Sequence, residues 1–186
     1  MAHLESCPKC KAAFIAALKK EFGEVIEQWH SGWPCKIEDV IANPKINGSI
    51  AKSLKEIYSG LQDYREHKVF VRTPLLPQSD YYIKSLNCLV EFDESQHFTA
   101  PRGQTLALYP KRLKLGFDRK KWIDKCNTLN RHDNDPAFRD EQRAWYDTLR
   151  DLLPSVFGMN PTVRVFAKDL IWCKESLEKI IGAISI

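Results

Sequence analysis

Residues 80–97 read DYYIKSLNCLVEFDESQH, and this stretch decides how the chain is expected to fold. It holds two short runs rich in aromatic, β-branched and aliphatic residues, at positions 80–83 and 88–93. Runs of this composition favour β-strands. The residues between them, which include the polar Ser85 and Asn87, are typical of a turn. The stretch therefore predicts two neighbouring strands, paired through a short connection.

The second of these runs ends in acidic side chains. Side chains alternate between the two faces of a strand, so Glu91 and Asp93 are expected on one face and Val90 and Phe92 on the other. Carboxylates that converge repel one another unless a cation lies between them. Asp80, on the preceding strand, can add a third carboxylate. The pattern therefore indicates a cation site at the end of the strand pair.

Carboxylate oxygens are the ligands that Mg²⁺ and Mn²⁺ prefer, and such an ion can activate water and neutralise charge on a phosphate. We expect Asp80, Glu91 and Asp93 to hold Mg²⁺ or Mn²⁺. Gln96 and His97 follow closely and can orient water or a phosphate oxygen. The alternative is a solvated strand end, where charged residues are common.

The remaining sequence alternates helical and strand patterns. Helices are predicted over residues 11–30 and 49–64, from Asp118, from Pro136 to the residue before Pro154, and around Leu177, Ile180, Ile181 and Ile184. Strands are predicted over residues 69–71, 80–83, 88–93 and 162–166. Residues 97–117 receive no assignment. This order predicts an α/β fold with a central mixed sheet between helices.

Length and composition fit one compact domain with an N-terminal extension. The 186 residues are 44% hydrophobic, which is enough to bury a core. We expect an N-terminal helical extension over residues 1–67 and an α/β core over residues 68–186. No leader pattern opens the chain and no stretch approaches a membrane span, so we expect a cytoplasmic protein without a membrane partner. The six cysteines are scattered, which favours free thiols.

The sequence resembles the motif of the PD-(D/E)XK nucleases at residues 77–80, PQSD, and 89–97, LVEFDESQH. It is most similar to the branch related to very-short-patch-repair endonucleases. The resemblance implies a restriction-endonuclease-like fold, with a central mixed β-sheet flanked by helices. It also implies that Asp80 and Glu91 are metal ligands and that His97 lies next to the reacting phosphate.

One position departs from the family signature. Asp93 stands where many relatives have a lysine that orients water, although an aspartate is usual in the similar branch. Lys84 could approach from the neighbouring strand, and the identity of the general base stays open. The family often adds an acid from a helix before the first strand, and Glu56 is the candidate here.

The helix predicted after Pro136 has a polar side and an apolar side. Its polar side carries Arg139, Gln142, Arg143, Tyr146 and Arg150, opposite Phe138, Trp145, Leu149 and Leu152. Gln142 and Tyr146 also resemble a Gln-x-x-x-Tyr element that some nucleases of this superfamily place beside the metal. We expect these two side chains to support the site. The alternative is an exposed charged face paired with Glu141 and Asp147.

Basic residues gather after the acidic stretch, in a chain whose formal charge is +4. Those expected to contact nucleic acid are Lys111, Arg112, Lys114, Arg119, Lys120, Lys121, Arg139 and Arg143. Lysines and arginines beside an acidic metal site suit a duplex gripped through its phosphates. The alternative is a solvated lysine-rich start of a helix.

A second metal site is suggested near the N-terminus. Cys7 and Cys10 form a CxxC pair, which is half of a structural Zn²⁺ site, and His30 and Cys35 could complete it. A CxxC without a second pair is also compatible with reduced, unliganded thiols. The remaining cysteines are expected in the core.

Together these features predict a Mg²⁺-dependent DNA endonuclease, a phosphodiesterase of restriction, repair or defence type acting on duplex DNA. Two alternatives stay open. One is a catalytically silent nucleic-acid-binding module on the same fold. The other is a subunit of a homo- or hetero-oligomeric nuclease that needs a partner for activity.

Overall fold

A computed structural model describes residues 8–169, 181, 182 and 184, with the backbone alone at residues 8–10. Its described part contains a four-stranded sheet in the order β1-β2-β3-β4. The strands are β1 (Val25–Trp29), β2 (Ser79–Ile83), β3 (Cys88–Asp93) and β4 (Val163–Phe166). β1, β2 and β3 are antiparallel, whereas β4 lies parallel to β3. The predicted α/β class with a mixed sheet is confirmed.

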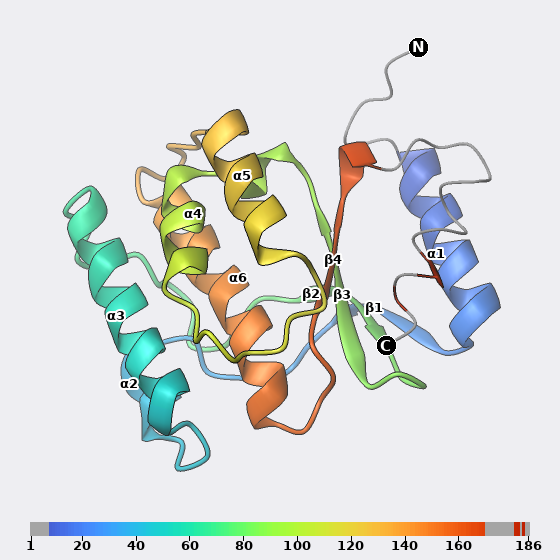
Figure 1. The fold of residues 1–186 in the computed structure, drawn as a ribbon, viewed down its shortest axis with the longest axis horizontal. Coiled ribbons are helices and arrows are strands. Elements are labelled where there is room, and N and C mark those ends of the chain that lie inside the picture. The colour runs from blue at the N-terminus through green and yellow to red at the C-terminus, as the bar shows by residue number, and fades with distance from the viewer. Residues whose placement is uncertain (1–7, 170–180, 183, 185–186) are drawn as a thin grey trace.

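Helices cover both faces of this sheet (Figure 1). α1 (Pro8–Phe22) packs on one face through Phe14 and Leu18. The other face carries α2 (Ile37–Ala42), α3 (Gly48–Tyr64), α4 (Ala100–Ala107), α5 (Arg119–Leu129) and α6 (Arg139–Val156). Two apolar cores result, a smaller one under α1 and a larger one around α6. Short 3₁₀ turns, Ser95–His97 and Ala167–Asp169, follow β3 and β4.

The predicted hairpin of β2 and β3 is confirmed, with Tyr81 opposite Val90 and Ile83 opposite Cys88. Its turn uses Asn87 at a left-handed φ of 44°, a conformation that asparagine tolerates better than most residues. Val90 and Phe92 pack in the core under α1. Glu91 therefore points toward the helices on the other face, as the alternation of strand side chains predicts.

The helix predicted over residues 11–30 is wrong beyond Phe22. Gly23 adopts a φ of 78° and ends α1, and β1 begins at Val25. Val25 then pairs with Ile83 and Trp29 with Ser79. The apolar spacing of these residues fits a helix or a strand, and pairing with β2 decides between them. Part of the expected helical extension over residues 1–67 is thus a strand of the central sheet.

The strand predicted over residues 69–71 is also wrong. This segment has no regular secondary structure and pairs with no strand of the sheet, and the Phe70 carbonyl accepts a hydrogen bond from the Gln142 side chain at 2.9 Å. The unassigned stretch contains α4, which Thr99 caps by accepting from the Arg102 backbone N–H. Pro101 lies in the first turn of α4. Backbone N–H groups in the first turn have no partner within the helix, so a proline there loses no helical hydrogen bond.

The other helices follow the predictions with shifted bounds. α5 begins at Arg119, one residue after the predicted start, and Asp118 is its N-cap. α6 begins at Arg139, three residues after Pro136, and continues through Pro154 to Val156. β4 lies at the predicted strand. Of the predicted closing helix, Leu177 and Ile180 lie outside the described residues, while Ile181 and Ile184 are helical.

Candidate functional site

Asp80 and Glu91 lie side by side where β2 begins and β3 ends. The backbone N–H of Asp80 donates to Glu91 Oε1 at 3.3 Å. The Asp80 carboxylate accepts from the backbone N–H of Phe92 at 2.8 Å. Because the two strands are antiparallel, the start of β2 meets the end of β3 at one end of the sheet. The structure therefore brings two of the three predicted metal ligands together.

Asp93 does not share that arrangement. Its side chain is 1% exposed, and Oδ1 lies 2.7 Å from Arg164 Nη1 while Oδ2 accepts from Trp122 Nε1 at 2.7 Å. Both oxygens are thus occupied by protein donors. Among the residues that the structure describes, no three carboxylate, histidine or cysteine side chains are grouped so that they could hold a metal ion. The expectation that Asp93 is a third ligand is not supported by its geometry.

Arg164 is the centre of a buried ion network that the sequence did not reveal. Its Nε lies 2.7 Å from Asp151 Oδ1, and its Nη2 lies 3.3 Å from Asp147 Oδ1. Asp151 is bound in turn by Arg102, at 2.6 Å. Buried charges are tolerated when each is paired and hydrogen-bonded. Arg164 and Arg102 therefore compensate most of the negative charge of the three aspartates between the sheet and α6.

His97 lies at the edge of this network with 20% of its side chain exposed. Its Nδ1 lies 2.9 Å from Asp147 Oδ2 and 3.6 Å from Asp93 Oδ1. Burial disfavours the charged imidazolium, but the two carboxylates outweigh it and raise the pKa of His97. The Nδ1 contact fixes the ring, so Nε2 is the nitrogen that could meet a substrate.

Glu91 is 4% exposed, and burial raises its pKa to about 7. Arg150 Nε, 3.5 Å from Glu91 Oε1, opposes that shift, whereas the charge of Asp80 adds to it. Burial also raises the pKa of Asp80. A nearby positive charge would therefore stabilise the ionised form of each carboxyl. With a pKa of about 7, Glu91 gains or loses its proton near neutral pH.

Lys11 is a second cation that the sequence did not single out. It reaches from α1 to the end of β3, where its Nζ lies 3.3 Å from Glu94 Oε1 and 5.3 Å from the centre of the Phe92 ring. Its charge lowers the pKa of Asp80, against the larger effect of burial. The proposed cation from the neighbouring strand, Lys84, instead pairs with Glu24 at the turn end of the hairpin.

Most of α6 is buried, so its polar side is not the exposed charged face that the alternative reading describes. Gln142 is 6% exposed and donates to the Phe70 carbonyl, and Tyr146 is 8% exposed with its hydroxyl 3.3 Å from Thr73 Oγ1. Both side chains therefore stabilise the packing of the segment after α3, and neither contacts Glu91 in the structure. Arg150, on the same polar side of the helix, does reach the candidate site, because its Nε lies 3.5 Å from Glu91 Oε1.

A polar pocket of about 370 Å³ opens beside the turn that follows β3. It is lined by Ser95, Gln96, Arg131, His132 and Asp133. The Gln96 side chain donates to Glu94 Oε2 at 3.1 Å, and the backbone carbonyl of Gln96 accepts from Arg143 at 2.9 Å. Gln96 therefore borders a space next to His97, while Arg143 is used to fix the turn.

The expected nucleic-acid contacts fall into two groups. Lys111, Arg112 and Lys114 are exposed in the segment between α4 and α5. The others bind protein groups: Arg119 the Tyr109 carbonyl, Lys120 Asp124, Lys121 Asp169, Arg139 Gln142 and Arg143 Asp133. Glu56, the candidate helix acid, pairs with Lys52 on the exposed side of α3. It lies away from the end of β3.

The suggested zinc site falls largely outside the described part. Cys7 and the side chain of Cys10 are not among the described residues. Cys35 is buried and its thiol donates to the Thr73 carbonyl at 2.8 Å, while His30 Nε2 lies 2.8 Å from Gln78 Nε2. Cys35 and His30 thus have partners within the fold.

No helix in the described ranges is long and apolar enough to span a membrane. Comparison with models of protein families, with curated proteins and with solved structures gives no match. The class of the protein therefore follows from its structure alone: it is an α/β protein with a mixed sheet. At one end of this sheet a carboxylate pair, a histidine and an arginine-centred ion network meet.

Proposed function

We propose that the chain is a Mg²⁺- or Mn²⁺-dependent endonuclease that hydrolyses phosphodiester bonds of DNA. The observation that carries this proposal is the position of Asp80 and Glu91 on adjacent strands, where the backbone N–H of Asp80 donates to Glu91 Oε1 and the Asp80 charge acts on the Glu91 carboxyl. Mg²⁺ usually binds one or two carboxylates and completes its shell with waters and substrate phosphates. Two carboxylates therefore fit such an ion, and a third protein ligand is not required.

The restriction-endonuclease-like fold is part of the same proposal. The mixed sheet has the acidic strands β2 and β3 in its centre, with helices on both faces. This arrangement is compatible with the fold that the motif at residues 77–97 implies. The supporting role expected for Gln142 and Tyr146 becomes indirect, because both stabilise the packing around α6.

Each residue of the centre has a distinct role in this proposal. Asp80 and Glu91 would hold the ion, which would supply an activated water and neutralise charge on the phosphate. His97, oriented by Asp147, would donate a hydrogen bond or a proton to a phosphate oxygen through Nε2. Asp93 is a positioning residue, because it holds Arg164 and Trp122 and lies 3.6 Å from His97.

Positively charged side chains would hold the phosphates of the substrate. Lys111, Arg112 and Lys114 are exposed, so their ammonium and guanidinium groups can meet backbone phosphates. The polar pocket lined by Gln96, the residue before His97, is a space in which a phosphate could be held. A restriction, repair or defence role follows only from the resemblance.

A cleavage assay tests the proposal. The purified chain is incubated with supercoiled plasmid and labelled duplexes in Mg²⁺, Mn²⁺ or EDTA. We expect cleavage with either metal and a loss of at least about 100-fold in Asp80→Asn and Glu91→Gln. Glu56→Gln, which removes an exposed paired acid on α3, should cleave like the unmodified chain. Absence of cleavage in every metal, or full activity in Asp80→Asn, would contradict the proposal.

The second candidate is a nucleic-acid-binding module without turnover, or a subunit of an oligomeric nuclease. The observation that favours it is the pairing of Asp93 with Arg164 and Trp122, which leaves two carboxylates where three were expected. Salt-sensitive DNA binding without cleavage in any metal would support the module. Cleavage that begins only when a partner protein is added would support the subunit.

A further inference from the structure

Arg150 of α6 fixes the backbone that leads into the candidate site. Its side chain is buried, with 8% of the residue exposed. Its Nη2 donates to the backbone carbonyls of Pro77 and Gln78, at 3.1 and 2.8 Å. These two residues immediately precede β2, which begins at Ser79. One side chain of α6 therefore holds the segment from which Asp80 extends.

The same guanidinium contacts two acids of the site. Its Nε lies 3.5 Å from Glu91 Oε1 on β3, and its Nη1 lies 3.4 Å from Asp147 Oδ1 on α6. Asp147 in turn holds the His97 ring. A guanidinium can make these contacts together because it is planar and has several donors in fixed directions. Arg150 thus joins the start of β2, the end of β3 and the aspartate that orients the histidine.

The contacts of the two candidate ligands leave one oxygen of each available. Glu91 Oε1 faces the Asp80 backbone N–H and Arg150 Nε. Asp80 Oδ2 accepts from the Phe92 backbone N–H at 2.8 Å. Within the described part of the chain, Glu91 Oε2 and Asp80 Oδ1 accept no hydrogen bond. These are therefore the two oxygens that a divalent ion could share.

Arg150 Nε is itself unsatisfied. The atom is buried, and among the residues that the structure describes it has no hydrogen-bond acceptor. A buried donor without an acceptor costs free energy. A rotation of the Glu91 carboxylate that brings Oε1 into line with Nε would remove this cost. Oε2 has no described protein donor to lose in that rotation.

We propose that Arg150 is a positioning residue of the candidate metal site. It holds Asp80 and Glu91 in place relative to each other, and its Nε binds Glu91 Oε1 when Glu91 Oε2 binds a divalent ion. This rests on the proposed function for the ion, whereas the placement of the two carboxyls is a property of the chain alone. A lysine would keep the charge, but one ammonium cannot reproduce the fixed donor geometry of a guanidinium.

Arg150→Lys tests the placement without metal and at constant charge. Hydrogen exchange is followed by NMR in EDTA at the amides of Asp80 and Phe92, which donate to the two carboxylates. Each rate is divided by that of the Ile83 amide in the same hairpin, which corrects for a change in global stability. We expect both ratios to rise at least about tenfold in Arg150→Lys.

Arg102→Lys is the matched control, because Arg102 is also buried and pairs with an aspartate of α6, Asp151, at 2.6 Å. It has no contact with Glu91 or with the segment before β2. Circular dichroism shows whether each variant is folded. The exchange ratios of Arg102→Lys should equal those of the unmodified chain. Equal ratios in Arg102→Lys and Arg150→Lys would overturn the proposal.

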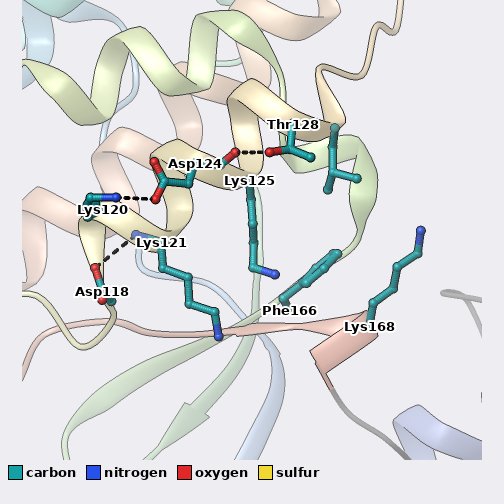
Figure 2. A pocket seen from close by; sticks show the side chains of 9 residues that line it. Asp118, Lys120, Lys121, Asp124, Lys125, Thr128, Phe166 and Lys168 are labelled. Atoms are coloured by element: carbon teal, nitrogen blue, oxygen red, sulfur yellow. Dashed lines mark hydrogen bonds and ion pairs between the residues drawn. The ribbon is translucent and has the colours of Figure 1, made fainter.

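Mn²⁺ titration by calorimetry tests the second part. We expect Arg150→Lys to bind Mn²⁺ at least about tenfold more weakly, as is usual when a residue that orients a metal ligand is replaced. Asp124→Asn controls for non-specific binding to carboxylates and should bind like the unmodified chain. Asp124 is an exposed acid of α5 that pairs with Lys120, beside a pocket of about 500 Å³ between α5 and the end of β4 (Figure 2). Unchanged affinity in folded Arg150→Lys would overturn the proposal.

The unmodified chain provides a test should Arg150→Lys not fold. In ¹⁵N-labelled protein titrated with Mg²⁺, the Nε–H resonance of Arg150 should shift, while that of Arg102 should not. Absence of a shift at saturating Mg²⁺ would overturn the proposal.

The two proposals fail in different ways. Raised exchange ratios in Arg150→Lys, with no Mn²⁺ binding by the unmodified chain, support the positioning role and contradict the nuclease. Metal-dependent cleavage, with unchanged exchange ratios and Mn²⁺ affinity in Arg150→Lys, contradicts the positioning role and leaves the nuclease proposal standing.

Discussion

Arg164 Nη1 lies 2.7 Å from Asp93 Oδ1, and both side chains are buried. The same guanidinium contacts Asp151 and Asp147 from α6. β3 and α6 are therefore joined through one cation on β4. This pairing separates the acids of β3 into two kinds: Asp93 belongs to the structural network, and Glu91 lies beside Asp80 at the candidate metal site.

Arg164→Leu should strongly destabilise the fold. Removing one partner of a buried ion pair leaves uncompensated carboxylates, at a cost of about 3–5 kcal/mol in the free energy of unfolding. Urea denaturation followed by circular dichroism measures this. Arg112→Leu, at an exposed position, should change the value by less than about 0.5 kcal/mol. Should Arg164→Leu not fold, Arg164→Lys is expected to fold with intermediate stability, and stability equal to the unmodified chain in either variant would contradict the account.

Glu91→Gln should stabilise the fold, and more so at high pH. The pKa of Glu91 is raised from 4.5 to about 7, so its favourable contribution is complete below pH 4.5 and is lost as pH rises through 7. Glutamine mimics the protonated form. We expect a gain of up to about 3 kcal/mol at pH 8 but less than about 1 kcal/mol at pH 5. Thermal or urea unfolding at both pH values checks this, and an equal effect at both would contradict the raised pKa.

Gly116→Ala should destabilise the fold. A Cβ at position 116 would lie 2.6 Å from the Thr162 carbonyl oxygen, which belongs to the backbone leading into β4. Relief requires a backbone shift, so we expect a loss of about 1–3 kcal/mol. Gly60→Ala is the control, because Gly60 lies within α3 with open space around it and should gain about 0.5–1 kcal/mol. Equal unfolding midpoints in urea for the two variants would contradict the predicted close approach.

Metal affinity should rise with pH. A proton on Glu91 competes with a divalent ion for the same carboxylate, and with a pKa of about 7 this group is mostly protonated at pH 6. We expect Mn²⁺ to bind about tenfold more tightly at pH 8 than at pH 6 in isothermal titration calorimetry. The raised pKa of Asp80 acts in the same direction. Glu91→Gln should bind more weakly and lose most of the pH dependence, whereas equal affinity at both pH values would count against Glu91 as a ligand.

Local sequence patterns predicted the elements whose partners are close in the chain. The hairpin of β2 and β3 and the facing of Glu91 follow from strand alternation and a short turn. The helix cap at Asp118 follows from local chemistry as well. The segment at Val25 could not be assigned in this way, because its apolar spacing fits both a helix and a strand, and the choice depends on β2, more than 50 residues later.

The same limit applies to the site. Acids near the end of β3 indicated a metal because no compensating cation lies close to Asp93 in the sequence. The cation is Arg164, 71 residues further on, and it is brought there by the parallel pairing of β3 and β4. Gln142 and Tyr146 were expected to support the site because of their Gln-x-x-x-Tyr spacing, but their hydrogen-bond partners lie on the segment after α3, which is distant in the sequence.

Anomalous scattering from crystals soaked in Mn²⁺ at pH 8 tests the central claim most directly. The account predicts an anomalous peak between the carboxylates of Asp80 and Glu91, with Asp93 still bound to Arg164 and Trp122. A Mn²⁺ ion bound elsewhere, or no peak at this end of the sheet at saturating metal, would contradict it.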